Sequence, residues 1–321
     1  MELPASLRQA VDRLLEGTPL TTLQGASKTL SDRYRAELRD GRLHLAGDAA
    51  VKAYLAARLP ATYAAVRASL EALEEALPDF APGTLLDIGA GPGTALWAAA
   101  QSWPGLGRAT LVEASAAARQ TGAWLASEGG LGVAANWIGA DATLGLGDLE
   151  AADLVTVAYM LDEIAPASRA KLISRLWALT ADTLLVVEPG TPAGWQRILE
   201  ARRALIEAGA SVAAPCPHQN PCPLAAPDWC HFSRRVARSR LHRLTKEADA
   251  PWEDEKFIYL AATRRSLPSP RARVLAPPKS GSGKVALKLC QPDGPVEERL
   301  FTRRDDTAFK AARRVDWGDT L

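Results

Sequence analysis

The first 80 residues repeat apolar side chains at intervals of three and four, the spacing of an amphipathic helix. The segments SLRQAVDRLLEG, VKAYLAARL and, after Pro60, ATYAAVRASLEALEEAL follow this pattern. We therefore expect residues 1–80 to form a helical N-terminal cap on the part of the chain that follows. No residue pattern in this segment indicates chemistry of its own.

From residue 83 the pattern changes to short apolar runs that alternate with helix-compatible stretches. The runs are TLLDIGAGPG, ATLVEAS, AANWIGAD, ADLVTVAYMLDEI and TLLVVEPG, in this order. Buried parallel strands have such continuous apolar runs, and helices between them predict a doubly wound α/β sheet. We expect a further helix over residues 192–208, and FIYLAATR as a late strand of the same sheet.

Residues 211–232 interrupt this pattern with five prolines and three cysteines. That density of proline excludes a regular helix, so we expect a Cys-rich insertion in a core of residues 81–265. The basic stretch SRRVARSRLHRLTK that follows has helix-compatible spacing. Residues 266–321 hold a Pro/Gly/Ser-rich basic connector and then KVALKLC and VEERLFTRR around the turn QPDGP. These runs predict a small β-rich C-terminal extension.

The composition is that of an ordinary globular protein, with 47% hydrophobic and 23% charged residues. The 321 residues suffice for about two domains. No apolar run approaches the roughly 20 residues that span a bilayer. Residues 1–17 have no apolar signal core, and Glu2, Asp12 and Glu16 argue against an Arg-rich transit peptide. We therefore expect a cytoplasmic protein of bacterial type, with no membrane partner, and a monomer.

The near-zero net charge conceals an asymmetry. Residues 1–200 hold 16 basic and 23 acidic side chains, a net charge of −7, whereas residues 201–321 hold 22 and 14, a net charge of +8. A basic half can bind a polyanion such as RNA, although a solvated face without a partner is the alternative. Nearby Trp229, Phe232 and Phe301 could stack on bases, but core packing is the simpler role for each. The candidate phosphate contacts are Arg234, Arg235, Arg238, Arg271, Arg273 and Lys284.

A glycine loop follows the first apolar run, in the sequence DIGAGPG. A strand that enters glycines at the start of a helix lets backbone N–H groups approach a ligand without hindrance from Cβ atoms. The glycines Gly89, Gly91 and Gly93 have the spacing G-x-G-x-G. The dinucleotide fingerprint G-x-G-x-x-G would need its last glycine where Thr94 stands.

Three acidic residues accompany this loop. Asp87 directly precedes the glycines and could hold the amino group of a ligand, directly or through water. Glu113 ends the second run, where a carboxylate can accept both ribose hydroxyls, and Asp141 ends the third run, near the expected adenine amino group. This order resembles class I S-adenosylmethionine-dependent methyltransferases. A glycine turn needed only for packing and an NAD site are the alternatives.

The segment after the fourth run lacks the motif expected for methyl transfer to a base nitrogen. Where Asn/Asp-Pro-Pro-aromatic often stands, this chain has AYMLDE at residues 158–163. The first 200 residues contain no cysteine, so a cysteine nucleophile is absent from the core. Asp162 or Glu163 could act as a general base. We favour the alternative that both are solvated residues at the start of the next helix.

All four cysteines lie in the basic half of the chain. Four clustered thiols in a reducing compartment are more readily ligands than disulfides. Four is the number that an iron–sulfur cluster or a structural Zn²⁺ ion requires, and the absence of C-x-x-C leaves both open. His218 and His231 offer nitrogen ligands, and small buried cysteines without a metal are the alternative. The four are Cys216, Cys222, Cys230 and Cys290.

Longer segments carry a family resemblance. RLPATYAAV, LLDIGAGPGTALWAA, VVEPGTPAGW, PCPHQNPCPL and DWCHFSRR occur in this order, followed by LC-x-P-DG and ARRVDWGD. From about residue 50 onward the chain resembles the methyltransferase-like proteins of the mitochondrial small ribosomal subunit and their bacterial homologues. The resemblance implies a Rossmann-like class I methyltransferase fold, association with the small ribosomal subunit during assembly, and rRNA as the polyanion. It also implies a [4Fe–4S] cluster on the four cysteines.

These observations favour one function over two others. The favoured hypothesis is an S-adenosylmethionine-binding, iron–sulfur-containing protein that associates with the small ribosomal subunit and supports its assembly and translation. The first alternative is an active S-adenosylmethionine-dependent rRNA methyltransferase that uses the same pocket. The second is a small-molecule methyltransferase with structural zinc, which the basic half disfavours.

Overall fold

The computed structural model describes residues 1–37, 40–267 and 270–321. The N-terminal part is helical, as expected, and α1 buries Leu7, Val11 and Leu15 at helical spacing. Within the described residues no helix is both long enough and apolar enough to span a membrane. The N-terminal helices are α1 (Ala5–Leu15), α2 (Leu20–Arg35), α3 (Asp48–Ala57) and α4 (Leu59–Ala76).

The central sheet has the strand order β3-β2-β1-β4-β5-β8-β6, with β7 paired to β8. Its first five strands are parallel, and β8 runs antiparallel to β5. A parallel sheet with one antiparallel strand near its edge is the Rossmann-like sheet of class I methyltransferases, which confirms the predicted fold class. The strands are β1 (Thr84–Ile88), β2 (Arg108–Val112), β3 (Ala134–Ile138), β4 (Ala152–Ala158), β5 (Thr180–Pro189), β6 (Ser211–Ala214), β7 (Phe232–Ala237) and β8 (Trp252–Thr263).

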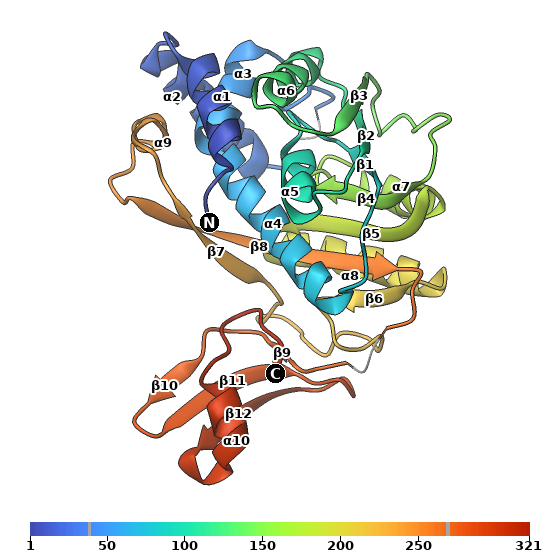
Figure 1. The fold of residues 1–321 in the computed structure, drawn as a ribbon, viewed down its shortest axis with the longest axis vertical. Coiled ribbons are helices and arrows are strands. Elements are labelled where there is room, and N and C mark those ends of the chain that lie inside the picture. The colour runs from blue at the N-terminus through green and yellow to red at the C-terminus, as the bar shows by residue number, and fades with distance from the viewer. Residues whose placement is uncertain (38–39, 268–269) are drawn as a thin grey trace.

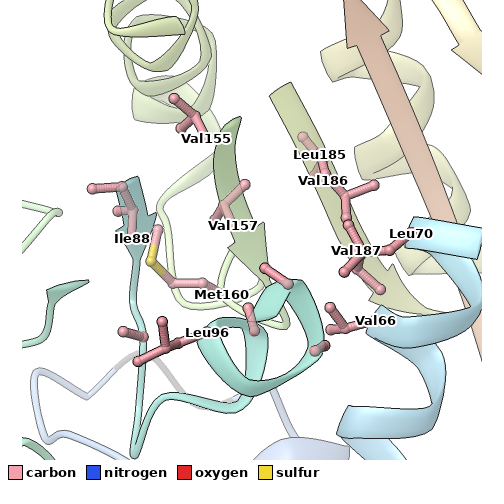
Figure 2. Packing of buried hydrophobic residues seen from close by; sticks show 14 of the residues in the cluster. Val66, Leu70, Ile88, Leu96, Val155, Val157, Met160, Leu185, Val186 and Val187 are labelled. Carbon is pink, nitrogen blue, oxygen red and sulfur yellow. The ribbon is translucent and has the colours of Figure 1, made fainter. Parts of the chain in front are cut away.

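Helices cover both faces of this sheet (Figure 1). α4 packs against α5 on one face, and α7 packs against α8 on the other. Val66 of α4 and Val157 of β4 are among the buried side chains of the core under the carboxyl ends of the strands (Figure 2). Two covered faces explain why the central strands β1, β4 and β5 are mainly apolar. The helices between the strands are α5 (Thr94–Ser102), α6 (Ala116–Glu128), α7 (Pro166–Ala178) and α8 (Pro192–Glu207).

The basic stretch after the insertion is not one helix. Its first half is β7, and only its second half forms a helix, α9 (Arg240–Lys246). The expectation of a continuous helix is wrong because β7 pairs with the acidic start of β8. Arg235 lies opposite Asp254 in this register, and opposite charges on facing strands stabilise the pairing.

The C-terminal residues form a second, smaller sheet with its own core, which we call the C-terminal unit (residues 270–321). Val285, Leu287 and Phe301 belong to this core, together with Phe309 from the last helix. The unit lies beside the β6 and β7 side of the main sheet (Figure 1). It contains β9 (Arg273–Val274), β10 (Lys279–Gly281), β11 (Lys284–Cys290), β12 (Val296–Thr302), η1 (Arg303–Asp305) and α10 (Asp306–Ala312).

Candidate functional site

The glycine loop between β1 and α5 forms one wall of a pocket of about 540 Å³, the glycine-loop pocket, at the carboxyl ends of the parallel strands. The loop needs glycine because Gly89, Gly91 and Gly93 have φ angles of +69°, +54° and +86°. A Cβ atom on Gly89 would also lie 2.4 Å from the sulfur of Met160. Gly89 and Gly91 line the pocket. Gly93 instead caps the start of α5 and packs against Trp137.

Asp87 is buried at the floor of this pocket. Its Oδ1 accepts a hydrogen bond from Thr156 Oγ1 at 2.7 Å, while Oδ2 has no partner among the described residues. Burial raises the pKa of Asp87 to about 7. A buried carboxylate oxygen without a partner requires an explanation, and a ligand that donates to it supplies one.

Glu113 and Asp141 line the same pocket. The carboxylate of Glu113 accepts from the backbone N–H groups of Gly91 and Ser115, at 2.9 and 2.7 Å. Asp141 Oδ1 accepts from the backbone of Thr143 at 2.8 Å. Burial raises the pKa of Glu113, and the two backbone hydrogen bonds oppose that shift. Each carboxylate keeps lone pairs for a further donor, so the geometry leaves room for a bound ligand.

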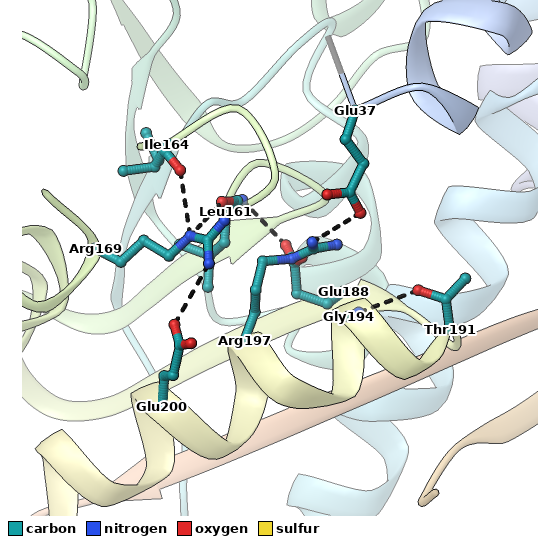
Figure 3. A network of polar contacts seen from close by, with 9 residues as sticks. All are labelled: Glu37, Leu161, Ile164, Arg169, Glu188, Thr191, Gly194, Arg197 and Glu200. Carbon is teal, nitrogen blue, oxygen red and sulfur yellow. Dashed lines mark hydrogen bonds and ion pairs between the residues drawn. The ribbon is translucent and has the colours of Figure 1, made fainter. Parts of the chain in front are cut away.

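A buried polar network fixes the loop between β4 and α7 (Figure 3). Arg169 Nε donates to the carbonyl oxygen of Leu161 at 3.1 Å. Glu188, fully buried in β5, accepts from Leu161 N at 3.1 Å and from Arg197 Nε at 2.5 Å. Arg197 also donates to Glu37 Oε1 at 2.9 Å, and this contact connects the residues just after α2 to the same polar network.

That fixed loop carries the two candidate bases, Asp162 and Glu163, and both line the pocket. The favoured expectation of two solvated residues at the start of the next helix is wrong, because Asp162 is buried and α7 begins only at Pro166. Burial, followed by the charge of Asp162, raises the pKa of Glu163 to about 8. Its Oε1 lies 3.7 Å from His44 Nε2. A carboxyl group with that pKa is mostly protonated at pH 7, and a protonated carboxyl group is not ready to remove a proton.

The N-terminal cap contributes to the pocket, a role that the sequence analysis missed. The carbonyl oxygen of Leu45 accepts from Ser115 Oγ at 2.5 Å, and its side chain lies over Gly91. The hydroxyl groups of Tyr54 and Thr94 are 2.8 Å apart. No local motif marks these residues, because each acts through a contact with a distant part of the chain.

A second polar group lies on the other side of the pocket. The carboxylate of Glu255 accepts from Tyr159 Oη at 2.9 Å and from Arg58 at 3.2 Å. Tyr159 directly follows β4 and has a φ angle of +56°, which is rare for a residue with a side chain. Strained residues of this kind concentrate at binding and catalytic sites, so this group completes the candidate site.

The four cysteines line one small cavity of about 30 Å³, the cysteine cavity. All four thiols are free, and burial raises their pKa values, that of Cys290 to about 12. Cys290 Sγ lies 3.4 Å from His218 Nε2, and Arg202 and Arg273 also line the cavity. Four thiols are the number and type of donor that an iron–sulfur cluster requires. Within residues 1–37, 40–267 and 270–321, no group of three or more His, Cys, Asp or Glu side chains is arranged to hold a metal ion.

The cysteine cavity lies where the Cys-rich insertion meets the C-terminal unit. Arg273 of β9 donates to the carbonyl oxygens of Pro215 and Gly318, at 3.0 and 2.7 Å. Asn220 of the insertion donates to the carbonyl oxygen of Asp293 at 3.2 Å. These contacts join the two parts around Cys290, which is the only cysteine in the C-terminal unit.

Three of the basic candidates lie on or beside β7 and are paired with carboxylates. Such pairing leaves less positive charge for a polyanion. Arg234 pairs with Glu71, Arg235 with Asp254 and Arg238 with Glu253, at N···O distances of 3.1, 2.9 and 2.8 Å.

The other three candidates differ in exposure. Arg273 is only 5% exposed and donates to backbone carbonyl oxygens, so it does not lie on a surface. Arg271 is exposed and lies 4.0 Å from Glu75. Lys284 is exposed at the start of β11. Phe301 is buried in the small core, where it is not available to stack on a base.

The fold and the glycine-loop pocket define a class I methyltransferase-like protein. The chain belongs to the family of mitochondrial small ribosomal subunit Rsm22 proteins, whose family model matches residues 48–321. It is 29% identical over 285 residues to human "Ribosome assembly protein METTL17, mitochondrial". The match covers 84% of this chain and 61% of that relative, so the chain spans about three fifths of the relative's length. The resemblance found in the sequence is thus confirmed for the family.

Solved methyltransferase structures are more distant. Magnesium protoporphyrin IX methyltransferase from Synechocystis PCC 6803 with bound S-adenosylmethionine is 15% identical, with a TM-score of 0.44 over 77% of this chain and 97% of that one. An O-methyltransferase family protein from Burkholderia thailandensis is 16% identical, with a TM-score of 0.45 over 77% of this chain and 72% of that one.

The family corrects the expected location. Both the family and the human relative are described as mitochondrial, which contradicts the expectation of a cytoplasmic, bacterial-type protein. That expectation relied on the acidic, weakly apolar composition of residues 1–17. In the structure, α1 is a packed helix whose apolar side chains are buried.

Proposed function

We propose that this chain binds S-adenosylmethionine and assists the assembly of the small ribosomal subunit. Membership of the Rsm22 family and similarity to a human ribosome assembly protein support the ribosomal part of this proposal. The polyanion in that setting is rRNA. The partial coverage of the relative makes the partner a proposal for this chain and not a transferred property.

One observation carries the assignment of the cofactor, namely the unpartnered Oδ2 of Asp87 at the floor of the glycine-loop pocket. A positively charged amino group such as that of S-adenosylmethionine would satisfy this oxygen. We assign Glu113 to the ribose hydroxyls and Asp141 to the adenine amino group, with Gly89 and Gly91 permitting close approach of the ligand. The volume of about 540 Å³ lies within the ordinary range for pockets that enclose small molecules.

We also propose that Cys216, Cys222, Cys230 and Cys290 hold a [4Fe–4S] cluster, with Zn²⁺ as the alternative. Support comes from the four free thiols around one cavity. The high thiol pKa values are those of cysteines without a bound metal, and a coordinating metal stabilises the thiolate form. In this arrangement the cluster would fasten the C-terminal unit to the methyltransferase-like core.

The test of the function uses immature small subunits from cells that lack the protein. The anaerobically purified chain and labelled S-adenosylmethionine are added, with Gly91→Arg as the matched variant. We expect the wild type to bind both the particles and the cofactor. Label in rRNA that disappears with Gly91→Arg would establish the alternative, an active rRNA methyltransferase. Failure of the wild type to bind the particles would refute the ribosomal assignment.

A further inference from the structure

The C-terminal unit carries a group of exposed basic side chains that stand apart from those on β7. Arg303 and Arg304 lie in η1, and Arg313 and Arg314 follow α10 directly. Among the residues that the structure describes, none of these side chains forms an ion pair, and neither does Lys284. We call these five residues the basic strip: Lys284, Arg303, Arg304, Arg313 and Arg314.

Acidic residues of the same unit are engaged elsewhere. Asp305 accepts a hydrogen bond from the backbone of Thr302 at 2.6 Å. Hydrogen bonds from Thr302, and not burial, hold the pKa of Asp305 below its usual value. Asp306 pairs with Lys310 at 2.9 Å. Asp319 accepts from the backbone of Asp316 at 2.7 Å. These carboxylates therefore bind groups other than the side chains of the basic strip, which have no ion-pair partner among the described residues.

The backbone arrangement brings the first part of the basic strip together. Arg303 N donates to the carbonyl oxygen of Gly283 at 3.2 Å, and its side chain lies over that glycine. Lys284 follows directly and lies opposite Thr302 in the register of β11 and β12. The other two arginines of the strip follow the far end of α10, where the guanidinium of Arg313 lies 5.7 Å from the ring centroid of Phe309.

We propose that the basic strip binds the sugar–phosphate backbone of rRNA. This inference rests on the proposed association with the small ribosomal subunit and assigns the surface that makes the contact. Phosphates are favoured over bases because Phe301 and Phe309, the rings beside the strip, are 2% and 8% exposed. Uncompensated guanidinium groups without exposed rings match sequence-independent phosphate binding.

The β7 arginines provide a matched comparison. Arg234 and Arg235 are adjacent, as are Arg303 and Arg304, so each pair removes the same charge when both residues become glutamine. Arg234 and Arg235 are already paired with Glu71 and Asp254, and this pairing weakens their electrostatic attraction for a phosphate group. The proposal therefore predicts different effects for two substitutions that change the net charge of the chain equally.

The experiment measures binding of the full-length protein to a transcript of the small-subunit rRNA at a series of salt concentrations. Each phosphate contact that is lost should reduce the salt slope by about 1. We expect the double variant R303Q/R304Q to have a slope shallower by about 1 to 2, with affinity about tenfold lower at 0.15 M salt. R234Q/R235Q should stay within about twofold of the wild type, and R303K/R304K should keep the wild-type slope.

Several outcomes would overturn this assignment. An unchanged slope in R303Q/R304Q, or an equal loss in R234Q/R235Q, would show that the basic strip makes no special contact. Loss of particle binding with full retention of rRNA binding would mean that the strip contacts a ribosomal protein. Wild-type protein that binds neither the transcript nor immature subunits would refute the proposed function as well. Thermal unfolding of each variant checks that the C-terminal unit remains folded.

Discussion

The glycine-loop pocket and the cysteine cavity differ in size and in the way the chain builds them. The first encloses about 540 Å³ at the carboxyl ends of adjacent parallel strands, and the second about 30 Å³. One wall of the pocket comes from loops that the sheet topology places together in any protein of this fold, and the N-terminal cap adds another through residues such as Leu45 and Tyr54. The walls of the cavity come from the insertion, from α8, from β8 and from the C-terminal unit, so the cavity is complete only when the C-terminal unit is docked.

The glycine-loop pocket therefore depends on the fold of the main sheet, whereas the cysteine cavity depends on docking of the C-terminal unit. A damaged cysteine cavity should leave β1 to β4 and the glycine loop intact, because none of them lines the cavity, whereas β8 and α8 contribute to both sites. A damaged pocket should likewise leave the contacts of Arg273 and Cys290 in place. Substitutions that act on one site alone therefore test whether the two are independent.

The largest expected effect is the loss of the cluster. Cys222→Ser removes one of four thiol ligands, and we expect the anaerobically purified variant to lose nearly all iron and sulfide. Its affinity for S-adenosylmethionine, measured by calorimetry, should remain within about threefold of the wild-type value. Full iron and sulfide content in the variant would contradict the assignment, and zinc in the wild type would establish the alternative metal.

The next effect is the loss of cofactor binding in Gly91→Arg. A side chain at a φ angle of +54° is strained, and this one would also enter the pocket beneath Leu45. We expect calorimetry to show affinity for S-adenosylmethionine reduced by more than about 100-fold, with unchanged iron content. Gly105→Arg is the matched control, because a Cβ atom at Gly105 would meet no atom within 4 Å. Unchanged affinity in Gly91→Arg would remove the pocket assignment.

Asp87→Asn should have a smaller effect that depends on pH. A charge-assisted hydrogen bond is worth about 1.5–3 kcal/mol, so we expect affinity to fall about 10- to 100-fold at pH 8. Burial raises the pKa of Asp87 to about 7, and only its ionised form attracts an ammonium group. Wild-type affinity should therefore rise more between pH 6 and pH 8 than that of Asp87→Asn, in which Glu163, with a pKa of about 8, still titrates beside the ligand. A parallel rise in both proteins would exclude Asp87 as the group that titrates.

The smallest expected effect concerns the contacts beside the cysteine cavity. Arg273→Gln removes the hydrogen bonds to Pro215 and Gly318, and we expect the C-terminal unit to lose about 2 kcal/mol of stability. Hydrogen exchange in β9 and β11 should become faster, while exchange in β1 and β4 should not change. Arg271→Gln, two residues away and exposed, is the control and should have almost no effect. Equal acceleration in both sheets would show that the two units do not unfold separately.

The sequence predicted the pocket better than it predicted the surface. Apolar runs and glycine spacing depend on local backbone geometry, so they located β1 and β4 and brought Asp87, Glu113 and Asp141 to one pocket. The role of Arg235 depended instead on Asp254, which reaches it across a strand pair that local periodicity does not reveal. The same limit explains why Leu45 was missed.

The cysteines illustrate an intermediate case. Their number indicated a metal site, but the spacing between Cys230 and Cys290 left open how the last one joins the others. The structure brings them together through docking of the C-terminal unit, in which Arg273 satisfies backbone groups of both parts. A residue type with many surface roles, such as arginine, cannot be assigned to such a junction from its position in the sequence.

The position of Cys290 has a consequence for the order of synthesis. During translation, Cys216, Cys222 and Cys230 leave the ribosome well before Cys290, and β8, the last strand of the main sheet, also precedes Cys290. Under the proposed ligand assignment, a nascent chain would have its cofactor pocket before its fourth cluster ligand. Delivery of iron and sulfide would thus follow synthesis of the main sheet and act as a checkpoint on docking of the C-terminal unit.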